Sequence, residues 1–235
     1  MIALVAALAM REFLRMCLPP ERKPEQLLCI ILAFVLTLVV GFAAFDELVA
    51  LLVLGFLLLS SIFLFRFKEL TTVISHLSLI LLGMFYIPLL LGHMILLHDY
   101  IHGKAWIFFV MFLVMASDSC AYFSGISFGK HKLYPAISPN KSIEGAVGGL
   151  LGGVFAAWIV HLWFFPELTL LDCVFLGAGL GAVSQIGDLF ESMLKRSYDV
   201  KDSGTLIPGH GGILDRLDSL LFAYPLAYYY AYFLI

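Results

Sequence analysis

Charged residues and glycines gather near the C-terminal end of this 235-residue chain, where they could bind a metal ion and phosphate groups. The cations there are Lys195, Arg196, Lys201 and Arg216, and the carboxylates are Asp202, Asp215 and Asp218. Carboxylate oxygens are suitable ligands for a hard cation such as Mg²⁺, while the cations would bind phosphate oxygens. The combination favours phosphoryl or nucleotidyl transfer, in which stabilising spread negative charge does most of the catalysis.

A glycine-rich turn lies inside this stretch. Gly209, Gly211 and Gly212 allow successive backbone N–H groups to point inward as an anion-binding nest. The turn is not a P-loop, because the sequence has no GxxxxGK[ST] pattern. His210 could be a base or a hydrogen-bonding loop residue, so no base chemistry is assigned to it.

A polar stripe precedes the turn on an otherwise apolar helix. Its members at helical spacing are Ser184, Asp188, Glu191, Ser192 and Lys195. Polar groups at membrane depth are costly, so the stripe must face a polar cavity or a partner. An ion path or a metal site would produce it, and a wholly structural stripe is a weaker alternative. Asp215, Asp218 and Ser219 share a face of the next helix, and Mg²⁺ would bind where they converge with Asp188.

A further carboxylate, Asp118, stands inside an apolar run. On a helix it would share a face with Tyr122, Gly125 and Gly129. A charge within a membrane span is usually functional, and we favour that interpretation over a carboxylate that simply meets water at the end of the helix.

A possible phosphate-docking segment follows this run. Pro139 stops any helix before it, and Ser142 can cap the helix that comes next. Lys141 would then stand at a helix N-terminus, where backbone N–H groups favour an anion. An ordinary capped helix start with a lysine that fixes topology explains these residues equally well.

The elements that position these residues are expected to be membrane helices. Apolar residues make up 62% of the chain, charged residues 13%, and the mean hydropathy is +1.00. We therefore predict an all-α, polytopic integral membrane bundle with about eight transmembrane helices. The hydrophobic runs are 2–16, 27–45, 48–65, 73–97, 105–126, 143–164, 170–190 and 214–235. The first is the weakest, because Arg11, Glu12 and Arg15 interrupt it.

The placement of basic residues predicts the orientation. All Lys and Arg residues except Lys104 fall in alternate loops on one side. Short basic loops stay cytoplasmic, so loops 127–142 and 191–213 should face the cytoplasm and the C-terminus the other side. No cleavable signal peptide is predicted, because residues 1–10 are apolar but short and lack a basic leader.

Two remaining patterns favour structural roles. The four cysteines lie far apart without a CxxC pair, so we interpret them as free buried thiols. Gly145, Gly149 and Gly153 recur every four residues, which is typical of close helix packing in lipid. We divide the single membrane domain, 1–235, into scaffold and dimer helices over 1–110 and catalytic helices and loops over 115–235.

The C-terminal half resembles a known family, the phosphatidate cytidylyltransferases or CDP-diacylglycerol synthases. The family's signature resembles Ser192-x-Leu194-Lys195-Arg196-x4-Lys201-Asp202-x-Gly204-x2-Ile207-Pro208-x-His210-Gly211-Gly212-Ile213-x-Asp215-Arg216-Leu217-Asp218. Two more segments are similar to it, Asp118-x2-Ala121-Tyr122-x2-Gly125-x3-Gly129 and Ser138-Pro139-x-Lys141-Ser142-x-Glu144-Gly145. The resemblance covers about residues 115–235, and the first 110 match only as hydrophobic helices.

The resemblance implies an Mg²⁺-dependent enzyme of phospholipid biosynthesis that makes CDP-diacylglycerol and pyrophosphate from CTP and phosphatidic acid. Asp188 and Asp215 would bind the metal, with a second cation as a further option, and Lys195 and Arg196 would be catalytic. The nucleotide and phosphate site would contain Ser192, Lys195, Arg196, Lys201, Asp202, His210, Asp218, Lys141 and Ser142. Further candidates from the residues themselves are Asp118, Gly211, Gly212 and Arg216. We expect membrane lipids and a second copy of the chain as partners, no nucleic acid, and a bacterial-type inner membrane location with a cytoplasmic active site.

Two alternatives belong to other classes of protein. An ion-coupled transporter could use Asp118 and Asp188 along its path, but the two halves show no inverted repeat with matching broken helices. Another Mg²⁺-dependent lipid phosphotransferase would share metal-binding carboxylates, but not the order of Lys-Arg, Lys-Asp and His-Gly-Gly seen here.

Overall fold

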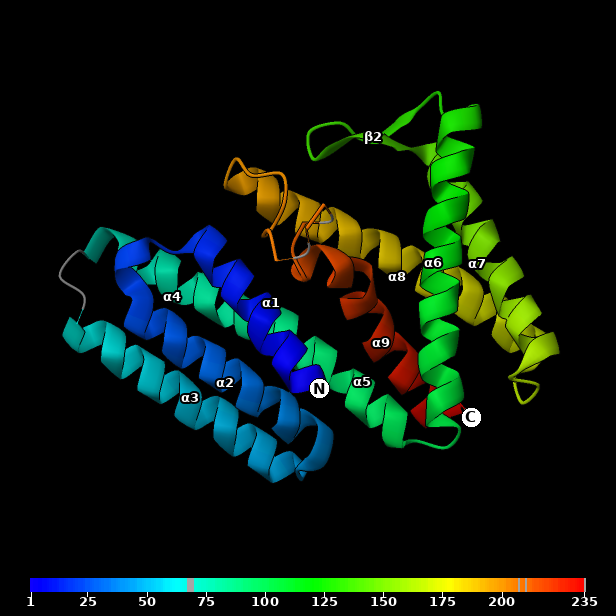
Figure 1. Cartoon of the computed structure of the whole chain (residues 1–235). Coiled ribbons are helices and arrows are strands. Elements are labelled where there is room, and N and C mark those ends of the chain that lie inside the picture. Colours follow the sequence, from blue (N-terminus) through cyan, green and yellow to red (C-terminus); the bar gives the residue numbers. More distant parts are fainter. Residues whose placement is uncertain (67–69, 207, 210, 235) are drawn as a thin grey trace. The chain divides into compact units, whose positions relative to one another are not determined.

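Helices make up most of the computed structural model, which describes residues 1–66, 70–206, 208–209 and 211–234 (Figure 1). They are α1 (Ile2–Cys17), α2 (Lys23–Phe42), α3 (Phe45–Arg66), α4 (Leu70–Met84), α5 (Leu90–Asp99), α6 (Gly103–Phe128), α7 (Ile143–Trp163), α8 (Leu170–Ser197) and α9 (Leu214–Leu234). A short 3₁₀ helix, Pro20–Arg22, precedes α2, and a π-helical turn, Phe85–Leu89, joins α4 to α5 at Pro88. Each predicted hydrophobic run therefore contains at least one helix.

Six segments within the described residues are long and apolar enough to cross a bilayer. They are Pro20–Phe42, Phe45–Arg66, Leu70–Asp99, Gly103–Phe128, Ile143–Trp163 and Leu170–Ser197. With 16 residues, α1 is shorter than the ~20 that a span requires. The prediction of an all-α membrane bundle is confirmed, and α1 and α9 lie outside the set of candidate spans.

The chain divides into two compact units. Unit 1 contains Met1–Leu96 and Asp202–Asp215, and unit 2 contains Leu97–Lys201 and Arg216–Ile235. In this division a segment of the C-terminal motif belongs to the same unit as the N-terminal helices, and the functional division into 1–110 and 115–235 stays a prediction. Each unit is described by itself below.

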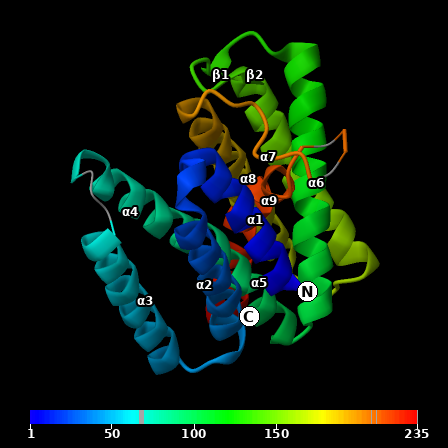
Figure 2. The same ribbon diagram turned by 60° about the vertical axis from the view of Figure 1, so that its left-hand side comes forward.

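Unit 1 is built around α1, which packs against α2 and α4. Ala6, Ala9, Met10 and Phe13 are fully buried, so an alanine-rich face of this helix lets its neighbours approach closely. Helix α3 returns beside α2 as the second arm of a helical hairpin (Figure 2). Unit 1 is thus a packed group of helices, and Ser203 and Leu214 of its C-terminal segment contact Glu12 of α1.

Unit 2 is built from closely packed helices that share glycines. Helix α7 packs along both α6 and α8. A Cβ added to Gly149 would lie 2.7 Å from Gln185 Nε2, and one added to Gly153 would lie 2.6 Å from the Gly177 carbonyl oxygen. Since any larger side chain would force these helices apart, the packing interpretation of the glycine spacing is confirmed.

A small antiparallel hairpin stands where the sequence predicted only a loop. It consists of β1 (Lys132–Tyr134) and β2 (Ser138–Ser142). The Glu144 carboxylate accepts hydrogen bonds from the Lys130 and His131 N–H groups at 3.1 and 3.2 Å and contacts His131 Nδ1 at 2.6 Å. Ser142 ends β2 and caps α7, as predicted, because its Oγ accepts from the Gly145 N–H at 3.1 Å.

Candidate active site

Four predicted site residues line one cavity of unit 2. The cavity has a volume of about 600 Å³ and lies where α6, β2, α7 and α8 meet. The four residues are Asp118, Lys141, Ser142 and Asp188. Tyr122 and Gly125 line it as well, so this part of the predicted α6 face is confirmed. The cavity therefore combines one cation and two carboxylates with an aromatic ring.

Asp188 is the centre of the charge in this cavity. Lys141 places its Nζ 2.5 Å from Asp188 Oδ2, and the Ser192 hydroxyl donates to Asp188 Oδ1 at 3.3 Å. Asp188 and Ser192 meet because they lie one turn apart on α8. Asp188 also lies near enough to Asp118 and Asp218 to repel both carboxylates. A ligand that brought positive charge here would relieve this repulsion.

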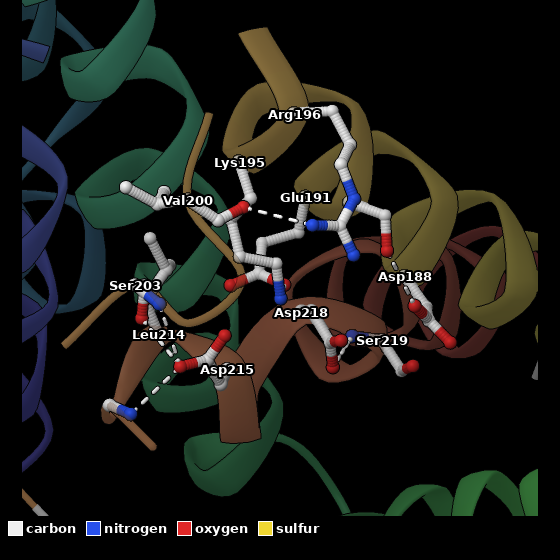
Figure 3. A network of polar contacts seen from close by, with 12 residues as sticks. Asp188, Glu191, Lys195, Arg196, Val200, Ser203, Leu214, Asp215, Asp218 and Ser219 are labelled. Atoms are coloured by element: carbon white, nitrogen blue, oxygen red, sulfur yellow. Dashed lines mark hydrogen bonds and ion pairs between the residues drawn. The ribbon is translucent and has the colours of Figure 1, made fainter. Parts of the chain in front are cut away.

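The next turn of α8 carries a second ion pair. Glu191 is completely buried and pairs with Lys195, one turn further along the helix. Lys195 also attracts the Asp218 carboxylate of α9. Arg196 is exposed, and its Nη1 donates to the Val200 carbonyl at 3.2 Å (Figure 3). The polar stripe predicted for this helix therefore faces packed charged groups rather than lipid.

In unit 1, the glycine-rich loop is organised by Asp215. Asp215 Oδ2 accepts hydrogen bonds from the Ser203 N–H, the Ser203 hydroxyl and the Gly212 N–H at 2.9, 2.9 and 2.7 Å (Figure 3). Gly209 and Gly211 have φ angles of +74° and +82°, which other residues rarely adopt. The Gly212 amide of the predicted nest thus faces an internal carboxylate, and binding of a ligand anion by this loop stays a prediction.

Glu12 is a structural partner of this loop that the sequence analysis missed. It is only 7% exposed, and its Oε2 accepts from the Leu214 N–H at 2.9 Å and from the Ser203 hydroxyl at 3.4 Å. The sequence analysis treated it as an interruption of an apolar run. A carboxylate in such a run is itself a signal of function, which could have marked Glu12 as it marked Asp118.

Polar groups of the cavity wall were also missed. Asn140 and Gln185 line the cavity with amide groups, and Ser138 adds a hydroxyl. Gln185 Nε2 donates to the Ala146 carbonyl at 3.1 Å, which ties α8 to α7 at the wall of the cavity. Gln185 stands next to Ser184 within the polar stripe, so its position on the helix was the available signal.

The other predicted residues divide between the units. Lys201 and Arg216 are exposed in unit 2, and Asp202 is exposed in unit 1. His210 lies outside the described residues. Asp188 belongs to unit 2 and Asp215 to unit 1, so their joint binding of one metal ion stays a prediction.

The donor chemistry of the cavity fits Mg²⁺. Among the described residues, no three His, Cys, Asp or Glu side chains form a ready-made metal site. Mg²⁺ seldom uses such an all-protein cage and binds through one or two carboxylates together with substrate phosphates. Asp118 and Asp188 offer hard oxygen ligands at one cavity. The arrangement therefore fits an ion whose coordination is completed by a phosphate-bearing ligand.

The chain is similar to known proteins over much of its length. A family model described as "Cytidylyltransferase family" matches residues 1–234. A phosphatidate cytidylyltransferase of Bacillus subtilis is 46% identical over 128 residues, which cover 54% of this chain and 48% of that protein. Relatives of the same name from Haemophilus influenzae and Staphylococcus aureus are 46% and 44% identical, over 59% and 58% of this chain and 49% and 52% of theirs. The chain spans about half the length of these curated relatives.

Proposed function

The chain belongs to the cytidylyltransferase family, and we propose that it transfers a cytidylyl group from CTP to phosphatidic acid. The products would be CDP-diacylglycerol and pyrophosphate. The observation that carries this proposal is the cavity of unit 2, where Asp188 stands between Lys141 and Ser192 in a helical membrane protein. The names of the curated relatives support CTP and phosphatidic acid as the substrates.

The reaction would be a direct displacement at phosphorus. A phosphate oxygen of phosphatidic acid forms a bond to the α-phosphorus of CTP, and the bond between that phosphorus and the α,β-bridging oxygen breaks. The electron pair leaves with pyrophosphate, so no covalent enzyme intermediate is required. An in-line displacement of this kind needs positioned substrates and stabilised negative charge more than it needs a protein nucleophile.

The residues of this chain would bind and orient the phosphates. Lys141 and Lys195 each now pair with a carboxylate of α8, and either lysine could contact a phosphate oxygen in the substrate complex. Arg196 would add a fork of N–H donors. Asp188 and Asp215 would hold Mg²⁺, which when bound neutralises charge on the phosphates and on the leaving pyrophosphate.

The setting of the reaction follows from the substrates and from the charge pattern. Phosphatidic acid lies in the bilayer, and the described part of the chain has six helical segments that could cross it. We propose a bacterial-type inner membrane location with the site on the cytoplasmic side, where CTP is found and where the basic loops are expected. We also propose a homodimer, which the resemblance to the family suggests.

The test is pyrophosphate release by the purified chain in detergent–lipid micelles. We expect release only when CTP, phosphatidic acid and Mg²⁺ are present together, with CDP-diacylglycerol formed in equal amount. EDTA should stop the reaction and added Mg²⁺ should restore it. Replacing CTP by UTP or ATP, or phosphatidic acid by diacylglycerol, provides the substrate controls.

Two results would contradict the proposal. Pyrophosphate release from CTP without phosphatidic acid would indicate hydrolysis rather than transfer. A folded chain that binds CTP but makes no lipid product with phosphatidic acid would indicate another acceptor, and phosphorylated sugars and other lipid phosphates would then be assayed in its place.

A further inference from the structure

A separate cleft lies in unit 1, between the end of α1 and the first turns of α2. It has a volume of about 340 Å³. Arg11 and Arg15 enter it from successive turns of α1, and Lys23 enters it from the first residue of α2. The turn between the helices is closed by Gln26, whose Nε2 donates to the Pro19 carbonyl at 3.2 Å. The fold thus brings three cations to one cleft.

The positive charge of this cleft is not balanced by nearby acids. Across residues 1–66, 70–206, 208–209 and 211–234, no Asp or Glu lines the cleft, and no carboxylate oxygen lies within 4.0 Å of the Arg11, Arg15 or Lys23 nitrogens. Two acids of the same helices are engaged elsewhere. Glu12 accepts hydrogen bonds from the glycine-rich loop, and the buried Glu25 pairs with an arginine of α3. An anion from outside the chain would therefore find three cations ready to contact it.

The lining of the cleft also has an apolar part. It contains Leu18, Leu27 and Ile30, and Leu27 is 58% exposed. Leu27 and Ile30 belong to the candidate span Pro20–Phe42, while the cations stand at the end where that span begins. Basic side chains at the end of a membrane helix lie at the depth of lipid phosphates, with the apolar residues facing acyl chains. The cleft therefore matches a ligand with an anionic head and an apolar tail.

We propose that this cleft binds the headgroup of an anionic phospholipid from the surrounding membrane. The two guanidinium groups contact the phosphate oxygens as paired N–H donors, and the Lys23 ammonium adds a third contact. The acyl chains lie along Leu27 and Ile30. None of the residues assigned to cytidylyl transfer lines this cleft, so the inference does not rest on the proposed function.

Native mass spectrometry of the full chain in mild detergent tests the site. The probe is phosphatidylglycerol, which is not the proposed substrate, compared with phosphatidylcholine of identical acyl chains. We expect preferential retention of phosphatidylglycerol, falling by about fivefold for each arginine charge removed in an Arg11→Gln/Arg15→Gln variant. The matched control is Arg22→Gln, which removes a cation of the same turn that does not line the cleft. This control should keep the preference of the unaltered chain.

Further arms of the experiment separate the alternatives. Arg11→Lys/Arg15→Lys keeps the charge and should retain most of the preference. Lys23→Gln should reduce the preference for phosphatidylglycerol by about as much as the loss of one arginine charge. If the double variant does not fold, the comparison of Lys23→Gln with Arg22→Gln tests the site. Equal loss in Lys23→Gln and Arg22→Gln, or an unchanged preference in the folded double variant, would overturn the proposal. Displacement of phosphatidylglycerol by an equal concentration of inorganic phosphate would overturn it as well, because the site would then bind free anions rather than lipid.

Discussion

The carboxylates of α8 and those around the glycine-rich loop are stabilised by different kinds of partner. On α8, Asp188 and Glu191 each pair with a lysine. Around the loop, Asp215 and Glu12 accept hydrogen bonds from backbone N–H groups and from the Ser203 hydroxyl. A lysine ammonium has three N–H donors on a flexible stem, so it can turn toward a phosphate without unfolding the chain, whereas a backbone N–H group cannot.

This difference indicates which carboxylates can exchange partners during a reaction. The pairs on α8 suit groups that meet a metal ion or a charged substrate. The contacts of Asp215 and Glu12 fix the shape of a loop, since a buried N–H without an acceptor is costly. Asp215 would combine this role with the proposed binding of Mg²⁺. Substitutions in the two regions should therefore affect activity and loop order in different proportions.

The largest loss is expected from Asp188→Asn. The change removes the charge that Lys141 and Ser192 contact, and with it a proposed metal ligand. CDP-diacylglycerol synthesis should fall by at least about a thousandfold. Hydrogen exchange of loop 202–214 should stay as it is in the unaltered chain. The matched control is Asp46→Asn on α3, an exposed aspartate that lines no described cavity, which should keep full activity.

Asp215→Asn should reduce activity by about a hundredfold or more and also loosen the loop. The amide offers one neutral acceptor where the carboxylate accepted three hydrogen bonds. Hydrogen exchange of residues 202–214, followed by mass spectrometry, should become faster. Slow exchange with complete loss of activity would instead mean that Asp215 binds the metal without fixing the loop, and the contrast between the two regions would fail.

A smaller effect is expected from Glu12→Ala, which leaves the Leu214 N–H buried without its acceptor. The loss of such a hydrogen bond costs about 1–3 kcal/mol, and removal of a supporting residue typically reduces activity by about tenfold. Glu12→Gln should recover part of the loss, because its carbonyl oxygen can still accept from the Leu214 N–H. The control is the exposed Glu21→Ala. Full activity in Glu12→Ala with an ordered loop would show that the loop does not need the first helix.

The side-chain contacts within α8 could be predicted from the sequence because they are local. A helix brings residues four apart onto one face, so Asp188 with Ser192 and Glu191 with Lys195 follow from spacing alone. The Ser142 cap and the glycine packing of α7 followed from equally local rules.

Contacts between distant residues could not be predicted in this way. Glu12 lies 191 residues from Ser203 and 202 from Leu214, and helical periodicity does not fix how such segments fold together. The hairpin was missed because it depends on Glu144 reaching back 13 and 14 residues to the His131 and Lys130 amides. In both cases the residue type was a usable signal, since a carboxylate near an apolar helix requires a partner.

The smallest effect is expected from Lys104→Ala. This variant tests whether activity depends on charge in the two compared regions or on any positive charge of the chain. Lys104 is the second residue of α6, at the end of that helix that the charge pattern places on the side opposite the active site. It is exposed, so its removal should change activity by less than about twofold. Activity is measured under the conditions used for Asp188→Asn. A loss as large as that of the α8 variants would place catalytic charge on both sides of the membrane, which contradicts the proposed topology.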